Sequence, residues 1–490
     1  MIERTTLYKP SLALLTDLYQ LTMAYGYWKS GTADKEAVFT LFFRENPFHG
    51  GFAVACGIQP ALEFLSRFRY DGDDIAYLST LTGNDGAPLF EPPFLEHLRD
   101  LRFTCEVDAV REGTVVFAHE PLLRVKGSIL QAQLVETALL TIINFQTLIA
   151  TKAARVCHAT RGEPVLEFGL RRAHGIDGGL AASRAAYIGG CHATSNVLAG
   201  RLYGIPVRGT HAHSWVMSFD TEIESFDAYA AAMPNNCVFL VDTYDTLDGV
   251  RHAIQAGNRL RERGHRMVGI RLDSGDLAYL SREARRLLNE AGYKDAVILA
   301  SNDLDEQIIA SLKEQGAAIA VWGVGTKLVT AYDQPALGGV YKLTALRKPG
   351  GAWQHPIKLS EQQIKITTPG QLQIRRFERS GEFSADLVYD ELQGCPNEPL
   401  MVDPLDPTRR RKLGRDLSSE DLLKPAFRNG SIVLDSEPLE RSRERTAGQL
   451  AGFHGGIKRF VNPHRYPVGL ELGLHELKTD LILKARGFSG

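Results

Sequence analysis

The sequence lacks the features of several broad classes of protein. Its six cysteines never form a Cys-x-x-Cys pair, which argues against a cysteine-based zinc site and favours reduced thiols in a cytosol. Neither charge is in excess, because the formal net charge is -2, so no basic field indicates nucleic acid. The composition, 44% hydrophobic and 23% charged without a low-complexity tract, is that of a globular protein with a large core.

A long hydrophobic run free of polar groups is also missing. The most apolar long segment, residues 135–154, is interrupted by Glu136, Asn144, Gln146 and Lys152, which predicts a buried helix rather than a membrane span. Residues 1–10 contain no apolar signal region. We therefore expect a cytoplasmic protein that contacts neither a membrane nor nucleic acid. A local basic cluster, "RRRK" at 409–412, is expected to lie in a solvated loop.

From about residue 160 the sequence becomes regular. Short β-rich runs recur at 164–168, 185–189, 205–209, 237–241, 267–271, 296–300 and 318–323. Helical patterns separate most of them, for example at 246–264, where Val250, Ile254 and Leu260 form an apolar stripe, and at 277–292. Apolar strands that alternate with capped helices predict a parallel sheet.

Seven such units in series favour an α/β fold in which the sheet forms an irregular, seven-unit barrel; an open doubly wound sheet is the alternative. We expect the barrel at 136–335. The flanks, 1–135 and 336–440, contain further β-like runs and are expected to form a separate, mainly β domain, with a helical closure at 441–490. The first flank should begin with a helix in "TDLYQLTMAYGYW", capped by Thr16 or Asp17.

A chemically reactive group follows each predicted strand. The groups read "GLRR", "HATSN", "THAHS", "DTYD", "LDSGD", "SND" and "GVGT". In an α/β barrel the carboxyl ends of the strands converge on one face, where active sites are built. Seven such groups in series indicate an enzyme rather than a structural protein.

The pair His211 and His213 in "RGTHAHSW" raises two hypotheses. A barrel metallohydrolase would use both as metal ligands, but a catalytic zinc usually has three protein ligands. The next histidines, His252 and His265, lie in a helical pattern and before a strand, so this hypothesis is disfavoured. His211 is expected to be a buried histidine held by hydrogen bonds, whereas the neighbours of His213 indicate a chemical role.

The later strand ends indicate a phosphorylated substrate. In "WGVGTK", Gly323, Gly325 and Thr326 stand where a strand meets a helix, and glycines there let backbone N–H groups approach a phosphate. Arg271 is a planar cation suited to phosphate or carboxylate. Carboxylates that follow three consecutive strands form a plausible Mg²⁺ environment; they belong to Asp242, Asp273 and Asp303. Asp276 is expected to be a helix cap.

At this point the chain resembles the nicotinate phosphoribosyltransferase family over essentially its whole length. The matching stretches include "TDLYQLTMAYGYW", "EFGLRRAHGIDGG", "TSNVLAG", "GTHAHSWVMSF", "GIRLDSGDLAYLS", "WGVGTKLVTAYDQPALGGVYKL" and "NPHRYPVGL". The resemblance implies an irregular barrel with a β-rich domain from both chain ends. It also implies the first step of NAD salvage from nicotinate, in which nicotinate and 5-phosphoribosyl-1-pyrophosphate give nicotinate mononucleotide and pyrophosphate.

The same resemblance implies roles for individual residues. ATP hydrolysis would be coupled through a phosphohistidine, which the pattern Gly-Thr-x-Ala-His places at His213. Asp242, Asp273 and Asp303 would line the magnesium and ribose side, with Asp242 and Asp273 as magnesium ligands. The remaining substrate contacts would come from Phe168, Arg171, Thr194, Ser195, Arg271, Gly323, Gly325 and Thr326. Tyr19 would stack on the pyridine ring from a second subunit, which implies a homodimer with shared active sites.

Two alternatives stay open besides the metallohydrolase. One is a nicotinamide phosphoribosyltransferase, and the other is a barrel protein that binds nucleotides without turnover. Nicotinamide-using relatives place an Asp in the loop that here reads Ala193, Thr194, Ser195 and Asn196. A serine hydroxyl can donate a hydrogen bond to a carboxylate, whereas an ionised Asp would repel it. The loop therefore favours nicotinate.

Overall fold

A computed structural model describes residues 11–362 and 365–488. The chain divides into two compact units, which we call the β unit (Met1–Leu148 with Ala336–Gly490) and the α/β unit (Ile149–Pro335). Described segments from before and after the α/β unit in the sequence thus belong to one unit. Residues 1–10, where no signal region was expected, lie outside the described residues. The segment limits taken from the sequence stay predictions.

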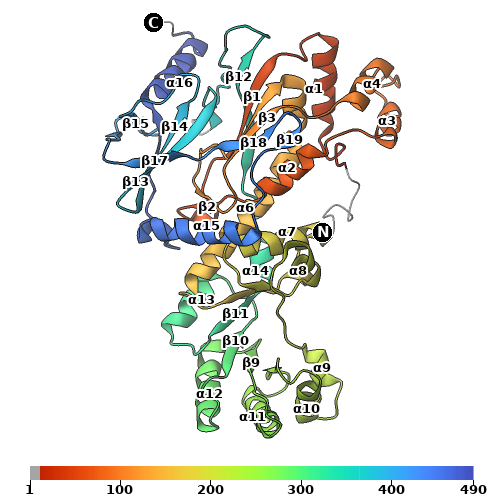
Figure 1. Ribbon diagram of the computed structural model, residues 1–490, viewed down its shortest axis with the longest axis vertical. Helices are drawn as coiled ribbons and strands as arrows, with labels where there is room; N and C mark the ends of the chain where they lie inside the picture. Colours follow the sequence, from red (N-terminus) through yellow and green to blue (C-terminus); the bar gives the residue numbers. More distant parts are fainter. Residues whose placement is uncertain (1–10, 363–364, 489–490) are drawn as a thin grey trace. The chain divides into compact units, whose positions relative to one another are not determined.

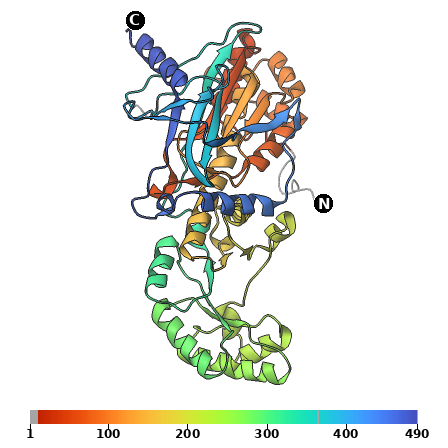
Figure 2. The same cartoon turned by 60° about the vertical axis from the view of Figure 1, so that its left-hand side comes forward.

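The β unit contains two six-stranded sheets and a two-stranded one. The first sheet has the order β12-β1-β5-β3-β18-β19 and the second β16-β15-β20-β14-β13-β17. The first therefore joins strands from both ends of the sequence side by side (Figure 2). The strands are β1 (Glu36–Phe43), β2 (Ala53–Val54), β3 (Glu106–Ala109), β4 (Val115–Val116), β5 (Leu123–Ser128), β12 (Gly339–Arg347), β13 (Leu372–Arg379), β14 (Glu382–Asp390), β15 (Leu400–Val402), β16 (Arg410–Lys412), β17 (Ser418–Asp421), β18 (Lys424–Arg428), β19 (Ser431–Ile432) and β20 (Val468–Glu471).

Helices accompany these sheets. The predicted first helix is confirmed and follows Asp17, whose extended backbone marks the cap position. A predicted loop is wrong: the basic cluster at 409–412 contains β16, because its backbone pairs with β15 in an antiparallel ladder. The helices are α1 (Leu18–Lys29), α2 (Ile58–Ser66), α3 (Gly72–Ser79), α4 (Pro92–Asp100), α5 (Ile129–Leu134), α6 (Glu136–Ala159), which extends into the α/β unit, α15 (Leu439–Gly452) and α16 (Leu472–Ala485).

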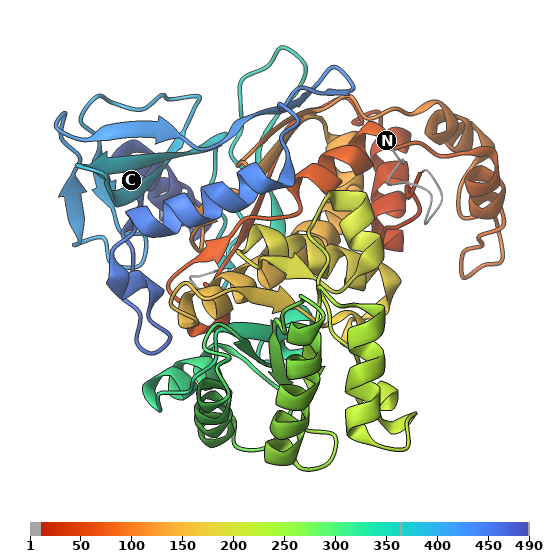
Figure 3. The ribbon, with the colours of Figure 1, turned by 60° about the horizontal axis from the view of Figure 1, so that its bottom comes forward.

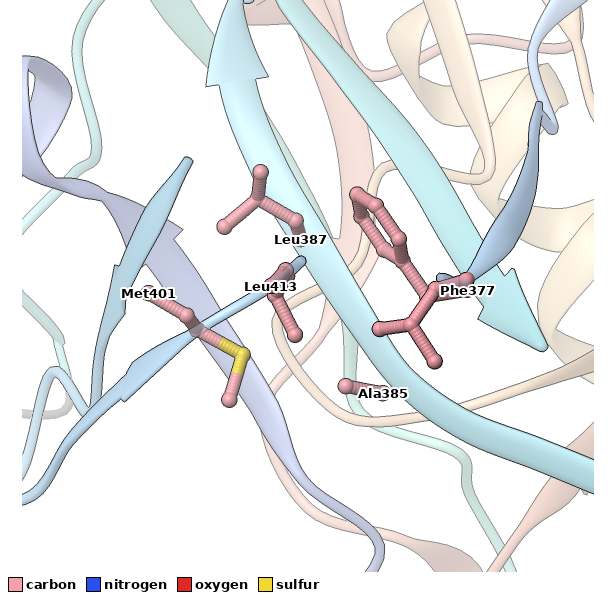
Figure 4. Packing of buried hydrophobic residues seen from close by; sticks show 6 residues of the cluster. Phe377, Ala385, Leu387, Met401 and Leu413 are labelled. Carbon is pink, nitrogen blue, oxygen red and sulfur yellow. The ribbon is translucent and has the colours of Figure 1, made fainter. Parts of the chain in front are cut away.

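The second sheet has its own small core. Phe377 from β13, Ala385 and Leu387 from β14, Met401 from β15 and Leu413 pack together (Figure 4). Their side chains share one face because successive residues of a strand point to opposite faces. This packing gives the second sheet an apolar core of its own.

The α/β unit holds a parallel sheet of the order β7-β6-β11-β10-β9-β8. The last strand of the unit, β11, pairs in parallel with the first, β6. Helices α11 (Thr246–Glu262) and α12 (Leu277–Glu290) lie side by side along it (Figures 1 and 3). The strands are β6 (Val165–Glu167), β7 (Ala193–Thr194), β8 (Val238–Leu240), β9 (Gly269–Leu272), β10 (Val297–Ala300) and β11 (Val321–Val324).

Aspartates begin three successive helices of this unit. Each side chain accepts a hydrogen bond from the backbone N–H three residues later, which satisfies one of the helix's unpaired donors. The caps are Asp245, Asp276 and Asp305, so the expected capping role of Asp276 is confirmed. The helices are α7 (Gly175–Ile188), α8 (Val197–Tyr203), α9 (His213–Met217), α10 (Glu222–Ala232), α11 (Thr246–Glu262), α12 (Leu277–Glu290), α13 (Glu306–Glu314) and α14 (Thr326–Val329).

Two of the seven predicted strands need correction. The run at 185–189 is the end of helix α7, because its alanines favour a helix and Gly189 and Gly190 terminate it. The run at 205–209 forms only one isolated parallel bridge, from Val207 to Thr194. The other five runs are confirmed as β6, β8, β9, β10 and β11. Residues 136–154 of the apolar segment lie in helix α6, as predicted. No described helix is long and apolar enough to cross a membrane.

Candidate active site

Groups that follow the parallel strands meet at one edge of the α/β unit. The Ser301 hydroxyl, after β10, accepts a hydrogen bond from Arg271 at the end of β9. The backbone N–H of Asp273, also after β9, donates to the carboxylate of Asp242, which follows β8. The predicted convergence is therefore confirmed for these three strands. The joining of strand ends follows from their parallel direction.

Arg271 is the cation at the centre of this edge. Its Nε donates to Ser301 Oγ at 2.8 Å, one terminal nitrogen to Thr210 Oγ1 at 3.1 Å and the other to Asp273 Oδ1 at 2.9 Å. The side chain is 15% exposed, and its guanidinium carbon lies 5.8 Å from the ring centre of Phe168. Ser301, Thr210 and Asp273 thus hold one planar cation in a fixed orientation.

His213 is the first residue of α9 and borders this cation's carboxylate partner. Its Nδ1 lies 3.1 Å from Thr243 Oγ1, and its Nε2 lies 3.5 Å from Asp273 Oδ2. Burial opposes ionisation of Asp273, but the Arg271 cation and hydrogen bonds from Ser301 and Arg271 hold the pKa of Asp273 below its ordinary value. Asp273 is therefore a carboxylate near neutral pH.

One of the two carboxylate oxygens of Asp242 makes hydrogen bonds and the other does not. Its Oδ2 accepts hydrogen bonds from the Asp273 N–H at 2.8 Å and from Ser274 Oγ at 2.6 Å. Its Oδ1 is buried and has no hydrogen-bond partner among the described residues. A buried carboxylate oxygen without a partner is costly. Asp242 is therefore suited to a cation or a donor brought by a ligand.

His211 is a structural histidine. Its ring is buried and packs edge-on to Tyr229, with ring centres 4.8 Å apart. The backbone N–H of Leu240 donates to Nε2 at 3.2 Å, and burial lowers the pKa of His211 to about 4. The ring is therefore neutral at physiological pH. Because Nε2 already accepts this bond, the structure does not favour the hypothesis that His211 and His213 form one metal site. Across the described residues, no three His, Cys, Asp or Glu side chains are grouped to hold a metal ion.

Gly323 in β11 and Gly325 just after it make room for Phe168. A Cβ at Gly323 would lie 2.7 Å from the Phe168 ring, and a Cβ at Gly325 would lie 3.2 Å from its carbonyl oxygen. The Phe168 N–H also donates to Val324 O at 2.8 Å. Gly325 precedes Thr326, the first residue of α14. The glycines thus have a packing role in addition to the phosphate role predicted from the sequence.

A buried acid that sequence reasoning missed connects two of the predicted substrate loops. Glu167 is 1% exposed. Its carboxylate accepts hydrogen bonds from Thr194 Oγ1 at 2.6 Å, Ser183 Oγ at 2.9 Å and the Gly169 N–H, and its carbonyl accepts from the Ser195 N–H. An acid inside an otherwise apolar strand, "PVLEF", was the available signal, because a buried charge needs partners.

Several other predicted site residues are more exposed to solvent. Arg171 and Asp303 are exposed, and Ser195 is half-buried. Asn302, just before Asp303, has a φ of 96°, which is uncommon for a residue other than glycine. Tyr19 belongs to the β unit, on α1, and is 49% exposed.

A parallel sheet that gathers a fixed cation, carboxylates and a histidine at one edge defines an α/β enzyme acting on an anionic substrate. Three family profiles match the chain: the nicotinate phosphoribosyltransferase N-terminal domain at residues 14–144, the nicotinate phosphoribosyltransferase family at 165–354 and the C-terminal domain at 371–478. The chain belongs to the nicotinate phosphoribosyltransferase family.

Known relatives are similar over nearly the whole length. The nicotinate phosphoribosyltransferase of Bacillus subtilis is 44% identical, covering 96% of this chain and 97% of the relative. The human one is 35% identical, with 96% of each covered. The crystal structure of the human enzyme superposes with a TM-score of 0.82 at 33% identity, covering 95% of this chain and 99% of that one. A nicotinate-nucleotide pyrophosphorylase from Pyrococcus furiosus, 20% identical with a TM-score of 0.66 over 90% of this chain and 95% of that one, shares the fold.

Proposed function

We propose that this enzyme transfers the phosphoribosyl group of 5-phosphoribosyl-1-pyrophosphate to nicotinate. The ring nitrogen of nicotinate forms a bond to C1 of the ribose as the bond from C1 to pyrophosphate breaks, giving nicotinate mononucleotide and pyrophosphate. The observation that carries this proposal is the match over 96% of the chain to relatives of this activity. The anchored Arg271 gives it a chemical basis.

The protein's task in this reaction is to stabilise charge. C1 becomes oxocarbenium-like while pyrophosphate leaves with several negative charges, and fixed donors lower the barrier because they need no reorganisation. Arg271 is such a donor, since Ser301, Thr210 and Asp273 orient it before substrate arrives. The carboxylates of Asp273 and Asp303 would face the ribose. Gly323, Gly325 and Thr326 would hold the 5-phosphate through their backbone N–H groups.

The donor set at this edge fits a magnesium ion. The unpartnered Oδ1 of Asp242 and the ionised Asp273 are hard oxygen ligands, and Mg²⁺ in proteins commonly uses one or two carboxylates with water and substrate phosphates. When bound, the ion would neutralise charge on the departing pyrophosphate. Asp242 and Asp273 are the residues that would hold it.

We further propose that ATP is a co-substrate and that His213 carries a phosphoryl group. The γ-phosphoryl group would move from ATP to a ring nitrogen, releasing ADP, and water would later cleave the phosphohistidine to phosphate. The ring is held by Thr243 next to Asp273 and is 39% exposed, so a phosphate donor can reach it. A charged phosphate there would pair with nearby cations and so alter substrate affinity.

The nicotinate pocket would be formed by the two loops that Glu167 connects. Phe168 would stack on the pyridine ring, and Arg171, Arg271 and the Ser195 hydroxyl would face its carboxylate. The Thr194 hydroxyl donates to Glu167, so Thr194 would act by positioning Ser195. This polarity favours nicotinate over nicotinamide.

A homodimer and an incomplete barrel complete the proposal. On and just before α1, five large apolar side chains are more than a third exposed, which favours a protein partner; they are Leu12, Leu15, Leu18, Tyr19 and Met23. A second copy of the chain would cover them and receive Tyr19.

In the α/β unit, β6, β7, Val207 and β8–β11 would form seven positions of a barrel whose ring is interrupted between Val207 and β8.

A product assay tests the proposed function. The enzyme is incubated with phosphoribosyl pyrophosphate and either nicotinate, nicotinamide or quinolinate, each with and without ATP. We expect product from nicotinate, with a higher rate when ATP is present. Equal kcat/KM for nicotinate and nicotinamide would overturn the choice of substrate, and no product at all would favour binding without turnover.

A labelling experiment tests the phosphohistidine. With ATP labelled at its γ-phosphate, His213→Ala should lose the label and the gain from ATP, while slow ribosyl transfer persists. His211→Phe is the matched control, because it fills the same buried space and should keep the label. Label that survives in His213→Ala but disappears in His211→Phe would reverse the assignment.

A further inference from the structure

The β unit contains a cavity of about 490 Å³ that shares no residue with the strand-end edge. Its lining comes from the end of β13, the start of β14, β16 and the segment 454–467, which includes part of the "NPHRYPVGL" motif. Three arginines and two histidines contribute to it. The proposed reaction gives none of these residues a role.

The lining carries more positive than negative charge, with three arginines and one glutamate. Arg411 donates to the carbonyl and hydroxyl oxygens of Ser384, at 2.9 and 2.6 Å. Both acceptors are neutral, so the positive charge of Arg411 is not cancelled. In the part of the chain that the structure describes, no carboxylate lies within ion-pair distance of Arg411 or of Arg459. Arg379 is paired with Asp416, and Glu382 also borders the cavity. Two cations therefore remain available to an anion.

The histidines add donors to these cations. Nδ1 of His454 accepts a hydrogen bond from the Gly456 N–H at 3.1 Å, so the hydrogen of a neutral ring is on Nε2. The ring of His464 lies nearby, with ring centres 6.4 Å apart. Neutral or protonated, both side chains can donate a hydrogen bond to an oxyanion.

A buried ion pair keeps the floor of the cavity rigid. The guanidinium carbon of Arg376 lies 5.1 Å from the ring centre of Phe383, and the Tyr466 hydroxyl donates to Asp386 at 3.0 Å. Arg376 and Asp386 are themselves fully buried and hydrogen-bonded to each other. A site whose floor is already ordered loses less conformational freedom on binding.

We propose that this cavity binds a phosphate-bearing anion of up to nucleotide size with at least two negative charges. Guanidinium groups match phosphate oxygens in a fork, and the volume lies within the usual range of small-molecule sites, about 300–1,000 Å³. Inorganic polyphosphates and nucleotides share this chemistry. The aromatic ring of Phe383 in the lining distinguishes them, because it offers a surface to a base but nothing to an inorganic anion.

Calorimetry with inorganic tripolyphosphate tests the site in the full chain. Because the strand-end edge also attracts anions, the titrations use the Arg271→Ala protein as background. There, Arg459→Ala should weaken binding about tenfold or more, since a charged donor to phosphate is lost. The matched control is Arg415→Ala, which removes an exposed arginine paired with Glu398 in the same unit but outside the cavity. Equal affinity in the two variants would overturn the proposal.

A second measurement locates the bound anion without a variant at the site. Phenylglyoxal modifies accessible arginines, and tripolyphosphate should slow modification of Arg411 and Arg459 but leave Arg415 unchanged, as read by peptide mass spectrometry. Protection of all three, or of none, would contradict a site in this cavity. Replacing tripolyphosphate with a non-hydrolysable ATP analogue separates the sources. If the ligand is a nucleotide, the analogue binds more tightly than tripolyphosphate and Phe383→Leu removes the difference; if it is inorganic, the two bind alike.

Discussion

Two arginine–carboxylate pairs, one in each unit, show how surroundings decide what a pair does. In the β unit, Arg376 and Asp386 are 1% and 0% exposed, and Arg376 also donates to Gln449 Oε1 and Val115 O. In the α/β unit, Arg271 and Asp273 are 15% and 28% exposed. The first, closed pair is inaccessible to ligands. The second, open pair lies beside Asp242, which accepts a hydrogen bond from the Asp273 N–H and has one oxygen without a partner.

The closed pair belongs to a larger buried network. Glu120 is fully buried beside it, and burial together with the Asp386 charge raises the pKa of Glu120 well above its ordinary value. The neutral form of Glu120 is thereby favoured, so the charges of Arg376 and Asp386 chiefly compensate each other. Such a pair adds little net stability, but removing one partner leaves an uncompensated charge. The ion pair of Arg271 with Asp273 instead orients Arg271, which is held where an anion can reach it.

Breaking the closed pair should have the largest effect. Arg376→Met leaves Asp386 buried without its cation, which we expect to cost about 3–5 kcal/mol of unfolding free energy. Urea unfolding followed by circular dichroism measures this. Arg379→Met is the matched control, because its pair with Asp416 is exposed on both sides and should be worth at most about 1 kcal/mol. Similar losses in both variants would remove the distinction between closed and open pairs.

Breaking the open pair should cost catalysis instead. Arg271→Ala removes a preorganised donor, so kcat/KM should fall by roughly a hundredfold to a thousandfold. The midpoint of urea unfolding should change less than in Arg376→Met, because the carboxylate partner of Arg271, Asp273, is 28% exposed and stays hydrated. Arg266→Ala is the control: Arg266 precedes the same strand and pairs at 80% exposure with Asp295. A large loss of stability without a loss of activity in Arg271→Ala would contradict the proposed role.

A substitution in the loop proposed to hold nicotinate sharpens the comparison by adding a negative charge to that pocket. Ser195→Asp should repel the carboxylate of nicotinate and reduce kcat/KM for it by about thirtyfold, or about 2 kcal/mol. The KM for phosphoribosyl pyrophosphate should change much less. Ser195→Ala is the control, since it removes the hydroxyl without adding charge. An equal effect of both substitutions would show that repulsion is not the cause.

The sequence predicted the strand-end edge better than it predicted the strands. Because the carboxyl ends of parallel strands must converge, the sequence could place Asp242, Arg271 and Asp273 at this edge. Five of the seven predicted runs are strands. The run at 185–189 was wrong because small apolar residues suit helix and strand alike, and only the tertiary packing of α7 separates them. Closing glycines at 189 and 190 were the signal that favoured the helix.

Buried polar partnerships were predicted only in part: the expected burial and hydrogen bonding of His211 are confirmed, but its partners were not predicted. His211 and His213 are two residues apart, yet one is buried against Tyr229 and the other borders Asp273. The pattern His-x-His allows both outcomes. Glu167 and Arg376 were missed for a related reason: an acid or a base in a strand is read as solvent-exposed unless its partners, which come from distant segments, are known. Such contacts depend on topology rather than on local pattern.

The smallest expected effect concerns Glu167. This acid is as buried as the closed pair, yet it lies next to the loops proposed to hold nicotinate. Its carboxylate holds the Gly169 N–H and the hydroxyls of Thr194 and Ser183, so it should fix the two loops proposed to hold nicotinate. Glu167→Gln replaces one acceptor oxygen with a donor that faces hydroxyls, which should cost about 1–2 kcal/mol. We expect this chiefly as a fivefold to thirtyfold higher KM for nicotinate, with KM for phosphoribosyl pyrophosphate nearly constant.

A matched substitution at the other end of the same strand separates positioning from stability. Glu163 precedes β6 and accepts hydrogen bonds from Lys313 and from Trp322 Nε1, at 2.6 and 2.7 Å, away from the carboxyl ends of the strands. Glu163→Gln should therefore lower the urea midpoint without changing KM for nicotinate. If Glu167→Gln and Glu163→Gln altered stability alike and neither changed that KM, Glu167 would be a structural acid only. A selective rise of KM in Glu167→Gln would place a fully buried carboxylate among the determinants of substrate affinity, because it acts through the two loops that it joins.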